Sequence, residues 1–283
     1  MNITRRQWLA ASILSATPAW AKRSKIKVGV TDWNLRMSGM VEAVALAKKI
    51  GFAGVEISLG RKAAGDKLPL DDAALQQKYL DAFKEHGIPA AGTCLDILHV
   101  NYLKNDKLGQ KWVLAGIPIT KKLGAKVMLM PFFGKGALDT QQAREYVGDF
   151  LRDAAKEAEK AKVVLGLENT CSARENAFIM DRARSKAVGA YYDIGNSTNA
   201  GYDIYEEMQW LGPKRICQIH LKDNPGFIGE GKIDFPKAMQ IIMSLGFEGF
   251  ANLETSSPTK SVENDMKRNL STVLKVMQEV KPS

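Results

Sequence analysis

Between residue 26 and its C-terminal end, the chain alternates strand-like and helix-like segments eight times. The strand-like segments are short and apolar without strict two-residue alternation, which is typical of parallel strands covered by helices. We expect strands at 26–30, 54–58, 89–95, 126–130, 163–168, 187–193, 216–221 and 249–254. We expect helices at 39–50, 71–86, 107–123, 139–161, 174–184, 203–211, 235–245 and 262–279.

Residues with capping chemistry mark several of these helix boundaries. Gly51 and Gly87 follow two predicted helices, where a glycine can adopt the left-handed backbone that ends a helix. Asp71 or Asp72 can cap the start of one helix, and Asp139 can cap the start of another. The boundaries therefore agree with the apolar periodicity.

Eight strand–helix pairs favour parallel strands joined by right-handed crossovers. A chain of 283 residues matches a closed (β/α)8 barrel, the α/β fold known as a TIM barrel. A doubly wound open sheet is the alternative, but the first strand is not followed by the GxGxxG pattern of a dinucleotide-binding fold. Because no linker rich in Pro, Gly or Ser interrupts the pattern, we expect one domain over residues 22–283.

The N-terminus has the pattern of a targeting segment. Arg5 and Arg6 precede an apolar stretch from Trp8 to Ala16, and the sequence AWA at 19–21 fits a cleavage site. We expect residues 1–21 to be a twin-arginine (Tat) signal peptide that directs the protein to the periplasm or outside the cell. A general secretory signal and a retained tail are the alternatives. The apolar stretch is too short for a stable membrane anchor.

Four acidic or imidazole side chains stand at the ends of the last four predicted strands. They are Glu168 in VVLGLEN, Asp193 in GAYYDIGN, His220 in RICQIHLKD and Glu254 in GFANLET. Adjacent parallel strands that end together bring such side chains to one place. Three buried carboxylates repel one another unless a cation neutralises them. We therefore expect a site for one divalent metal, while a buried ion-pair network without metal is the alternative.

These segments together resemble the xylose isomerase-like barrel superfamily of sugar isomerases and epimerases. The resemblance lies in LEN, YYDIGN, HLKD followed by GEGKIDF, and NLET. It implies that Glu168, Asp193, His220 and Glu254 bind the metal and that the two Glu residues also transfer protons. One position departs from the pattern, because several epimerases of this type carry His where this chain has Asn196.

The ligand set indicates the metal and the chemistry. Mostly oxygen ligands with one imidazole favour Mn²⁺, and Mg²⁺, Co²⁺ or Zn²⁺ are also compatible. Such an ion can hold the carbonyl and the adjacent hydroxyl of a sugar, and it stabilises the enediolate formed when the α-hydrogen is removed. Glu168 and Glu254 would share the proton transfers, with Asp193 and His220 as ligands.

Six further residues are candidate substrate contacts, each with a structural alternative. Strand alternation points Lys222 to the same face as His220, where it binds substrate or neutralises the acidic cluster. The amide of Asn196 can hydrogen-bond to a sugar hydroxyl. The remaining candidates could instead have loop, rim-packing or positioning roles, and they are Glu56, His99, Asn169 and Trp33.

The expected function is a metal-dependent isomerase or epimerase that acts on a small sugar. Elimination from a 3-keto-glycoside by the same metal and Glu base is a close alternative, and a non-catalytic periplasmic sugar-binding protein is another. The net charge of +9 is spread over helices that also carry Glu and Asp, and three histidines are too few for a multi-zinc endonuclease. We therefore expect no nucleic-acid partner, and the oligomeric state stays open.

Overall fold

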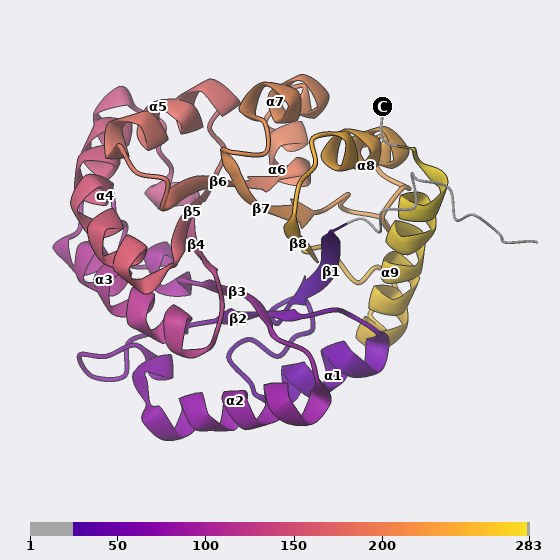
Figure 1. Cartoon of the computed structure of the whole chain (residues 1–283), viewed down its shortest axis with the longest axis horizontal. Helices are drawn as coiled ribbons and strands as arrows, with labels where there is room; N and C mark the ends of the chain where they lie inside the picture. Colours follow the sequence, from indigo (N-terminus) through magenta and orange to yellow (C-terminus); the bar gives the residue numbers. More distant parts are fainter. Residues whose placement is uncertain (1–24, 282–283) are drawn as a thin grey trace, which may run out of the picture.

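The computed structural model describes residues 25–281. Its eight strands are all parallel and close into a barrel in sequence order, because β1 pairs with both β2 and β8. Figure 1 looks down this barrel and shows the strands at the centre. The strands are β1 (Ile26–Thr31), β2 (Val55–Ser58), β3 (Ala90–Cys94), β4 (Val127–Phe132), β5 (Val164–Asn169), β6 (Val188–Asp193), β7 (Ile216–Leu221) and β8 (Gly249–Leu253).

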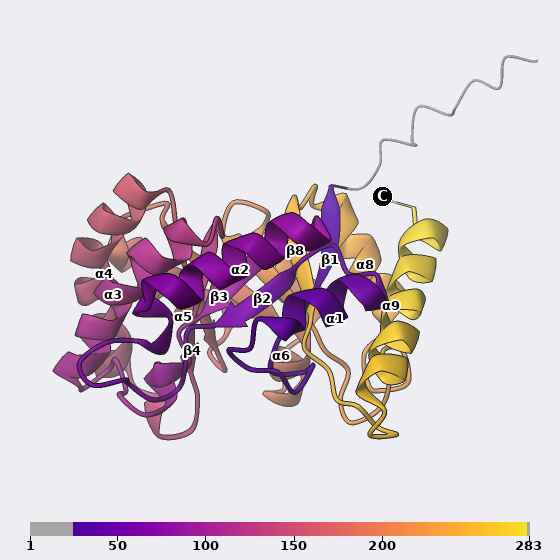
Figure 2. The same cartoon turned by 90° about the horizontal axis from the view of Figure 1, so that it is seen from below.

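The helices form an outer ring around the strands (Figure 1). The side view in Figure 2 shows α1 and α2 lying along the outside of the sheet. The α-helices are α1 (Glu42–Ile50), α2 (Ala73–His86), α3 (Lys107–Lys122), α4 (Gln141–Ala161), α5 (Ala173–Ala183), α6 (Ile194–Asn199), α7 (Ile204–Leu211), α8 (Phe235–Ser244) and α9 (Val262–Glu279). Short 3₁₀ turns cover η1 (Pro69–Asp71), η2 (Asp96–His99) and η3 (Gly134–Gly136).

Local sequence explains where these helices begin and end. Gly51 and Gly87 have φ angles of 113° and 65° and end α1 and α2 as expected. Asp72 caps α2 by accepting a hydrogen bond from the Leu75 backbone N–H. The expected cap at Asp139 is wrong by one residue, because the Thr140 side chain accepts from the Ala143 N–H at the start of α4.

The predicted single-domain (β/α)8 barrel is confirmed, and the expected strands lie where the structure has them to within about three residues. The short helix α6, which directly follows β6, was not expected. The predicted leader at residues 1–21 lies outside the described residues. Among helices in the described range, none is long and apolar enough to cross a membrane.

Strand register places the chemical groups at one end of the barrel. Asp193 is paired with His220 across β6 and β7, and Glu168 is paired with Pro131 across β5 and β4. The backbone N–H of Glu254, one residue beyond β8, donates to the carbonyl of Leu221. Leu167 is paired with Ala190 across β5 and β6, so the strands are staggered, and their carboxyl ends all lie at one end of the barrel.

Candidate metal centre

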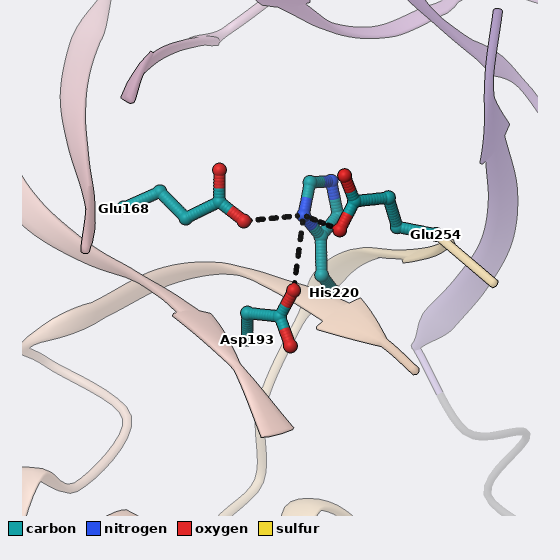
Figure 3. Close-up of side chains that lie close together, drawn as sticks. All are labelled: Glu168, Asp193, His220 and Glu254. Atoms are coloured by element: carbon teal, nitrogen blue, oxygen red, sulfur yellow. Dashed lines mark hydrogen bonds and ion pairs between the residues drawn. The ribbon is translucent and has the colours of Figure 1, made fainter. Parts of the chain in front are cut away.

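The four predicted ligands converge on one point. Each offers one ligand atom, and these atoms all lie within 4.8 Å of one another. His220 Nδ1 is 3.0 Å from Glu168 Oε1, 3.5 Å from Glu254 Oε2 and 3.9 Å from Asp193 Oδ2. Figure 3 shows the three carboxylates reaching the imidazole from different directions, with Glu168 and Glu254 on opposite sides. The arrangement can surround a single ion.

The start of α6 orients Asp193. This residue is the N-cap of the helix, and its Oδ1 accepts a hydrogen bond of 2.7 Å from the backbone N–H of Asn196. Its Oδ2 is thereby turned toward His220. The side-chain amide of Asn196 lies 3.5 Å from Glu168 Oε1. Asn196 thus contacts two of the predicted ligands, one through its backbone and one through its side chain.

Burial and mutual repulsion perturb the acids of this cluster. Glu168, Asp193 and His220 are all less than 5% exposed. Burial raises the pKa of Glu168 and of Asp193, and the neighbouring Glu254 raises both further. Burial alone would also raise the pKa of Glu254, but His220 and Lys222 outweigh it and lower that pKa. The cluster therefore requires cationic partners for its carboxylates.

Lys222 supplies one of these cationic partners. Its ammonium lies 3.0 Å from Asp193 Oδ2 and forms an ion pair with Glu254 Oε2. It also donates to Asn196 Oδ1 over 3.2 Å. Burial would lower the pKa of Lys222, but Asp193 and Glu254 raise it, so the side chain stays charged. Lys222 has the predicted position beside His220 and neutralises part of the cluster.

The donor set fits a divalent cation. Three carboxylates and one imidazole nitrogen are ligands suited to Mn²⁺, Mg²⁺, Co²⁺ or Zn²⁺. Glu254 Oε2 is buried, and the ammonium of Lys222 is its ion-pair neighbour. A cation held by the three carboxylates and His220 Nδ1 would complete the coordination of that oxygen.

Trp33 connects the first strand–helix loop to the site. Its indole Nε1–H donates to Glu254 Oε1 over 2.9 Å, and its ring meets the imidazole of His220 edge-on with centroids 6.0 Å apart. This leaves Glu254 Oε2 as the oxygen that faces the other ligands. The structure therefore places Trp33 against a predicted ligand, whereas the sequence suggested a substrate contact or packing at the barrel rim.

Glu56 lies on the other side of His220. Its carboxylate is fully buried, and its Oε2 is 3.0 Å from His220 Nε2. The same oxygen accepts hydrogen bonds from the hydroxyl of Tyr191 and the amide of Asn252 over 2.6 and 2.8 Å. Gln218 Nε2 donates to the Tyr191 hydroxyl over 3.0 Å. Glu56 is thus enclosed by protein groups.

Sequence reasoning missed this network, although a signal for it exists. Tyr191, Gln218 and Asn252 each stand two residues before a predicted ligand, so they point into the barrel one layer below the site. Such interior layers are usually filled by branched apolar residues. Polar side chains at three matched positions therefore indicate a second functional layer.

The last two predicted contacts, His99 and Asn169, have hydrogen-bond, ion-pair or ring partners outside the four-residue cluster. His99 stacks on Phe133 with ring centroids 6.2 Å apart, and its Nε2 is 3.9 Å from Asp96 Oδ1. Asn169 exchanges hydrogen bonds with the side chain of Asn176 over 2.8 and 3.1 Å. Asn169 therefore ties the end of β5 to α5, and its predicted role beside Glu168 stays a prediction.

Known proteins resemble this chain over most of its length. A curated relative from Actinoplanes, named 2-epi-5-epi-valiolone 7-phosphate 2-epimerase, is 26% identical over 200 residues, which cover 70% of this chain and 73% of the relative. An L-ribulose 3-epimerase structure aligns with a TM-score of 0.73 at 15% identity, covering 89% of this chain and 95% of the other. The IolI protein, solved with a bound zinc atom, aligns with a TM-score of 0.71 at 18% identity, covering 89% of this chain and 98% of the other.

These likenesses agree with a family model. The model described as xylose isomerase-like TIM barrel matches residues 44–277, which include all four converging side chains. The chain belongs to the xylose isomerase-like TIM barrel family.

Proposed function

We propose that this protein is a divalent-metal-dependent isomerase or epimerase of a small sugar. One observation carries the proposal, namely the convergence of three carboxylates and one imidazole within 4.8 Å at the carboxyl end of the barrel. The family membership supports it, as does the relative named as a 2-epimerase. Catalytic groups of this fold gather at that end of the strands.

Glu168 and Glu254 are the proposed proton-transfer groups. They reach the centre from opposite sides (Figure 3), so one can take a proton from a carbon next to a carbonyl and the other can return one to the opposite face. Transfer to the opposite face inverts the carbon, whereas return to the neighbouring carbon moves the carbonyl. A divalent ion, when bound, supplies Lewis-acid polarisation of that carbonyl.

The remaining residues of the site hold these groups and the substrate. Trp33 and Lys222 fix Glu254 from two sides, and Asn196 links Glu168 to Asp193. We propose Lys222 and Asn196 as contacts of a sugar hydroxyl, because both carry polar atoms at the edge of the cluster. His99 is a proposed contact farther along the strand ends. Mn²⁺ is the proposed ion because carboxylate oxygens dominate the donor set.

Export through the twin-arginine route is a separate proposal that rests on the pattern in residues 1–21. A fusion of residues 1–25 to a reporter tests it directly. We expect the fusion to reach the periplasm and the Arg5→Lys, Arg6→Lys double variant to remain in the cytosol. Continued export of that variant would contradict the twin-arginine route.

Hydrogen exchange with solvent tests the proposed chemistry. The protein is incubated with Mn²⁺ in D₂O with a panel of keto-sugars and 3-keto-glycosides, and products are read by NMR and mass spectrometry. We expect deuterium beside a carbonyl and a product of otherwise unchanged mass. Glu168→Gln should abolish exchange, whereas the matched change Glu157→Gln, on the exposed surface of α4, should not.

Two other outcomes would replace this proposal. Release of an aglycone from a 3-keto-glycoside would identify a lyase that uses the same base. Sugar binding without any deuterium uptake across the panel would identify a binding protein. Failure to retain Mn²⁺, Mg²⁺, Co²⁺ or Zn²⁺ in equilibrium dialysis would leave an ion-pair network and end the metal-dependent mechanism.

A further inference from the structure

Glu56 is an unusual carboxylate, because it is fully buried as the second residue of β2 and its Oε2 contacts His220 from the side away from the other carboxylates. A single oxygen, Oε2, faces three donors: the Tyr191 hydroxyl at 2.6 Å, the Asn252 amide at 2.8 Å and His220 Nε2 at 3.0 Å. A buried carboxylate is tolerated when hydrogen bonds stabilise it in this way. These contacts leave no access for a substrate to Oε2.

The contact with Glu56 determines which nitrogen of the His220 imidazole remains available to the metal site. Glu56 Oε2 already accepts hydrogen bonds from Tyr191 and Asn252, so it is also the acceptor at its contact with His220, and Nε2 carries the proton between them. Nδ1 then faces Glu168, Glu254 and Asp193. The Tyr191 ring packs on the imidazole at a centroid distance of 4.5 Å, and Trp33 meets it edge-on at 6.0 Å. The ring is thus held by one hydrogen bond and two aromatic neighbours.

The barrel wall is shaped to accommodate this polar layer. A Cβ atom at Gly29 of β1 would overlap the Asn252 amide oxygen. A Cβ atom at Gly92 of β3 would lie 2.8 Å from Gln218 Nε2 and 3.6 Å from the carboxyl carbon of Glu56. Two glycines therefore make room for polar side chains: Gly29 for Asn252 of the neighbouring β8, and Gly92 for Glu56 of the neighbouring β2 and for Gln218 of β7 across the barrel.

We propose that Glu56 is a positioning residue that orients His220 so that Nδ1, and not Nε2, is the ligand atom of the metal site. The inference rests on the proposed metal-dependent function for its consequence, while the contact between Glu56 and His220 stands on geometry alone. A carboxylate that accepts the second N–H of a ligating histidine fixes the ring and increases its basicity, and loss of such a partner weakens metal binding by about 10- to 100-fold.

Metal affinity is the first measurement. Purified wild type, Glu56→Gln, Glu56→Ala and Tyr191→Phe are titrated with Mn²⁺ in equilibrium dialysis, with circular dichroism to confirm folding. We expect binding about 10-fold weaker for Glu56→Gln and about 100-fold weaker for Glu56→Ala. Tyr191→Phe removes one donor to Glu56 and keeps its contact with His220, so its loss should be smaller than either.

The protonated nitrogen is the second measurement, and it distinguishes positioning from a general structural role. The chain has only three histidines, so ¹⁵N-histidine NMR spectra can be assigned with a His220→Gln variant. With Zn²⁺ as a diamagnetic probe, we expect a hydrogen-bonded proton on Nε2 and none on Nδ1. In Glu56→Gln, the NMR signal of the Nε2 proton should shift upfield, as expected for a weaker hydrogen bond.

The two measurements separate the possible failures. Unchanged Mn²⁺ affinity and an unchanged Nε2 signal in Glu56→Gln would overturn the proposal, as would a proton on Nδ1 with zinc on Nε2 in wild type. If wild type binds none of the divalent ions, the proposed function fails, and the Nε2 signal of the unloaded protein still decides whether Glu56 orients the ring. If the Glu56 variants do not fold, the wild-type spectrum decides.

Discussion

The two halves of the barrel mouth stabilise buried carboxylates in different ways. At the ends of β5 to β8, Glu168, Asp193 and Glu254 lie around the cationic or polar groups of His220 and Lys222. At the end of β1, Asp32 is fully buried without a described basic side chain in contact. Its Oδ2 accepts hydrogen bonds from the backbone N–H groups of Gly39 and Ser58 over 2.9 and 3.0 Å.

The ends of β5 to β8 form a site in which several charged groups lie together, whereas the end of β1 belongs to a scaffold half in which the buried acid is neutral. Burial raises the pKa of Asp32 to about 8, and the nearby Asp96 and Glu56 contribute, although the two backbone N–H groups act against the rise. Asp32 is therefore protonated at neutral pH and clamps the loop after β1 to β2. The carboxylates at the ends of β5 to β8 need cationic partners, whereas the buried carboxyl group of Asp32 needs a proton.

The largest expected effect comes from removing the common partner of the three acids. His220→Ala deletes the nitrogen that lies within 3.9 Å of all three carboxylates. We expect Mn²⁺ affinity to fall by more than about 100-fold, because a ligand and its hydrogen-bonded support are both lost. Equilibrium dialysis measures this. Retention of wild-type affinity would mean that these side chains do not form the metal site.

Removing the ammonium should destabilise the site half of the barrel. Lys222→Met removes the ammonium that pairs with Asp193 and Glu254 and leaves His220 as their neighbour, and breaking a buried pair costs about 3–5 kcal/mol. We expect the free energy of unfolding, measured in urea without added metal, to fall by an amount in this range. Added Mn²⁺ should restore part of it. Stability equal to wild type would show that Lys222 is not needed for charge balance.

In the scaffold half, the contribution of Asp32 to the free energy of unfolding should decrease as pH rises. The folded pKa of Asp32, about 8, exceeds its unfolded value of 3.8, so the folded state binds the extra proton between these pH values. Stability from this group is therefore greatest at low pH and declines as pH rises toward 8, by about 1.4 kcal/mol per pH unit. Asp32→Asn lacks this dependence.

Urea unfolding of wild type and Asp32→Asn at pH 5 and pH 8 provides the comparison. We expect the variant to gain stability relative to wild type between the two pH values. If the difference in free energy of unfolding between wild type and Asp32→Asn is the same at both pH values, Asp32 is ionised in the folded protein. The two halves of the barrel mouth would then both contain ionised buried carboxylates.

The smallest effect should come from a hydroxyl in the scaffold half. Ser58 donates to Asp96 Oδ2, and its Oγ accepts from the Gly60 N–H over 3.2 Å. Ser58→Ala should lower the free energy of unfolding by about 1–3 kcal/mol, because it removes both hydrogen bonds of the hydroxyl and leaves their partners without it. Mn²⁺ affinity should stay within about twofold. A large loss of metal binding would show that the two halves are coupled.

Much of the barrel and the convergence of the four candidate ligands could be predicted from sequence, because both follow from local patterns. Each strand was a short apolar run, and each ligand stood at the end of one. The role of Glu56 could not be predicted in this way. Its partners Tyr191 and Asn252 are 135 and 196 residues away in the chain, and only closure of the barrel brings them together.

Local competition explains the smaller differences. Helix α6 escaped notice because IGNSTN contains no apolar periodicity, and its start depends on the Asp193 cap. Thr140, and not Asp139, caps α4, and the two could not be told apart from sequence because both types of side chain can accept the required hydrogen bond. Asn169 looked like a ligand-positioning residue, and its partner Asn176 lies one turn inside the following helix.

Contacts between the two ends of the chain complete the cluster at the carboxyl end of the barrel. Trp33 and Glu56, from the first fifth of the chain, hold Glu254 and His220 from the last quarter. A chain that contains all four candidate ligands still lacks the contacts of Trp33 and Glu56 with them until the barrel closes. If the four side chains bind a metal as proposed, a truncated chain that begins after β2 would retain all four and bind the ion poorly, so metal uptake would report complete assembly of the barrel.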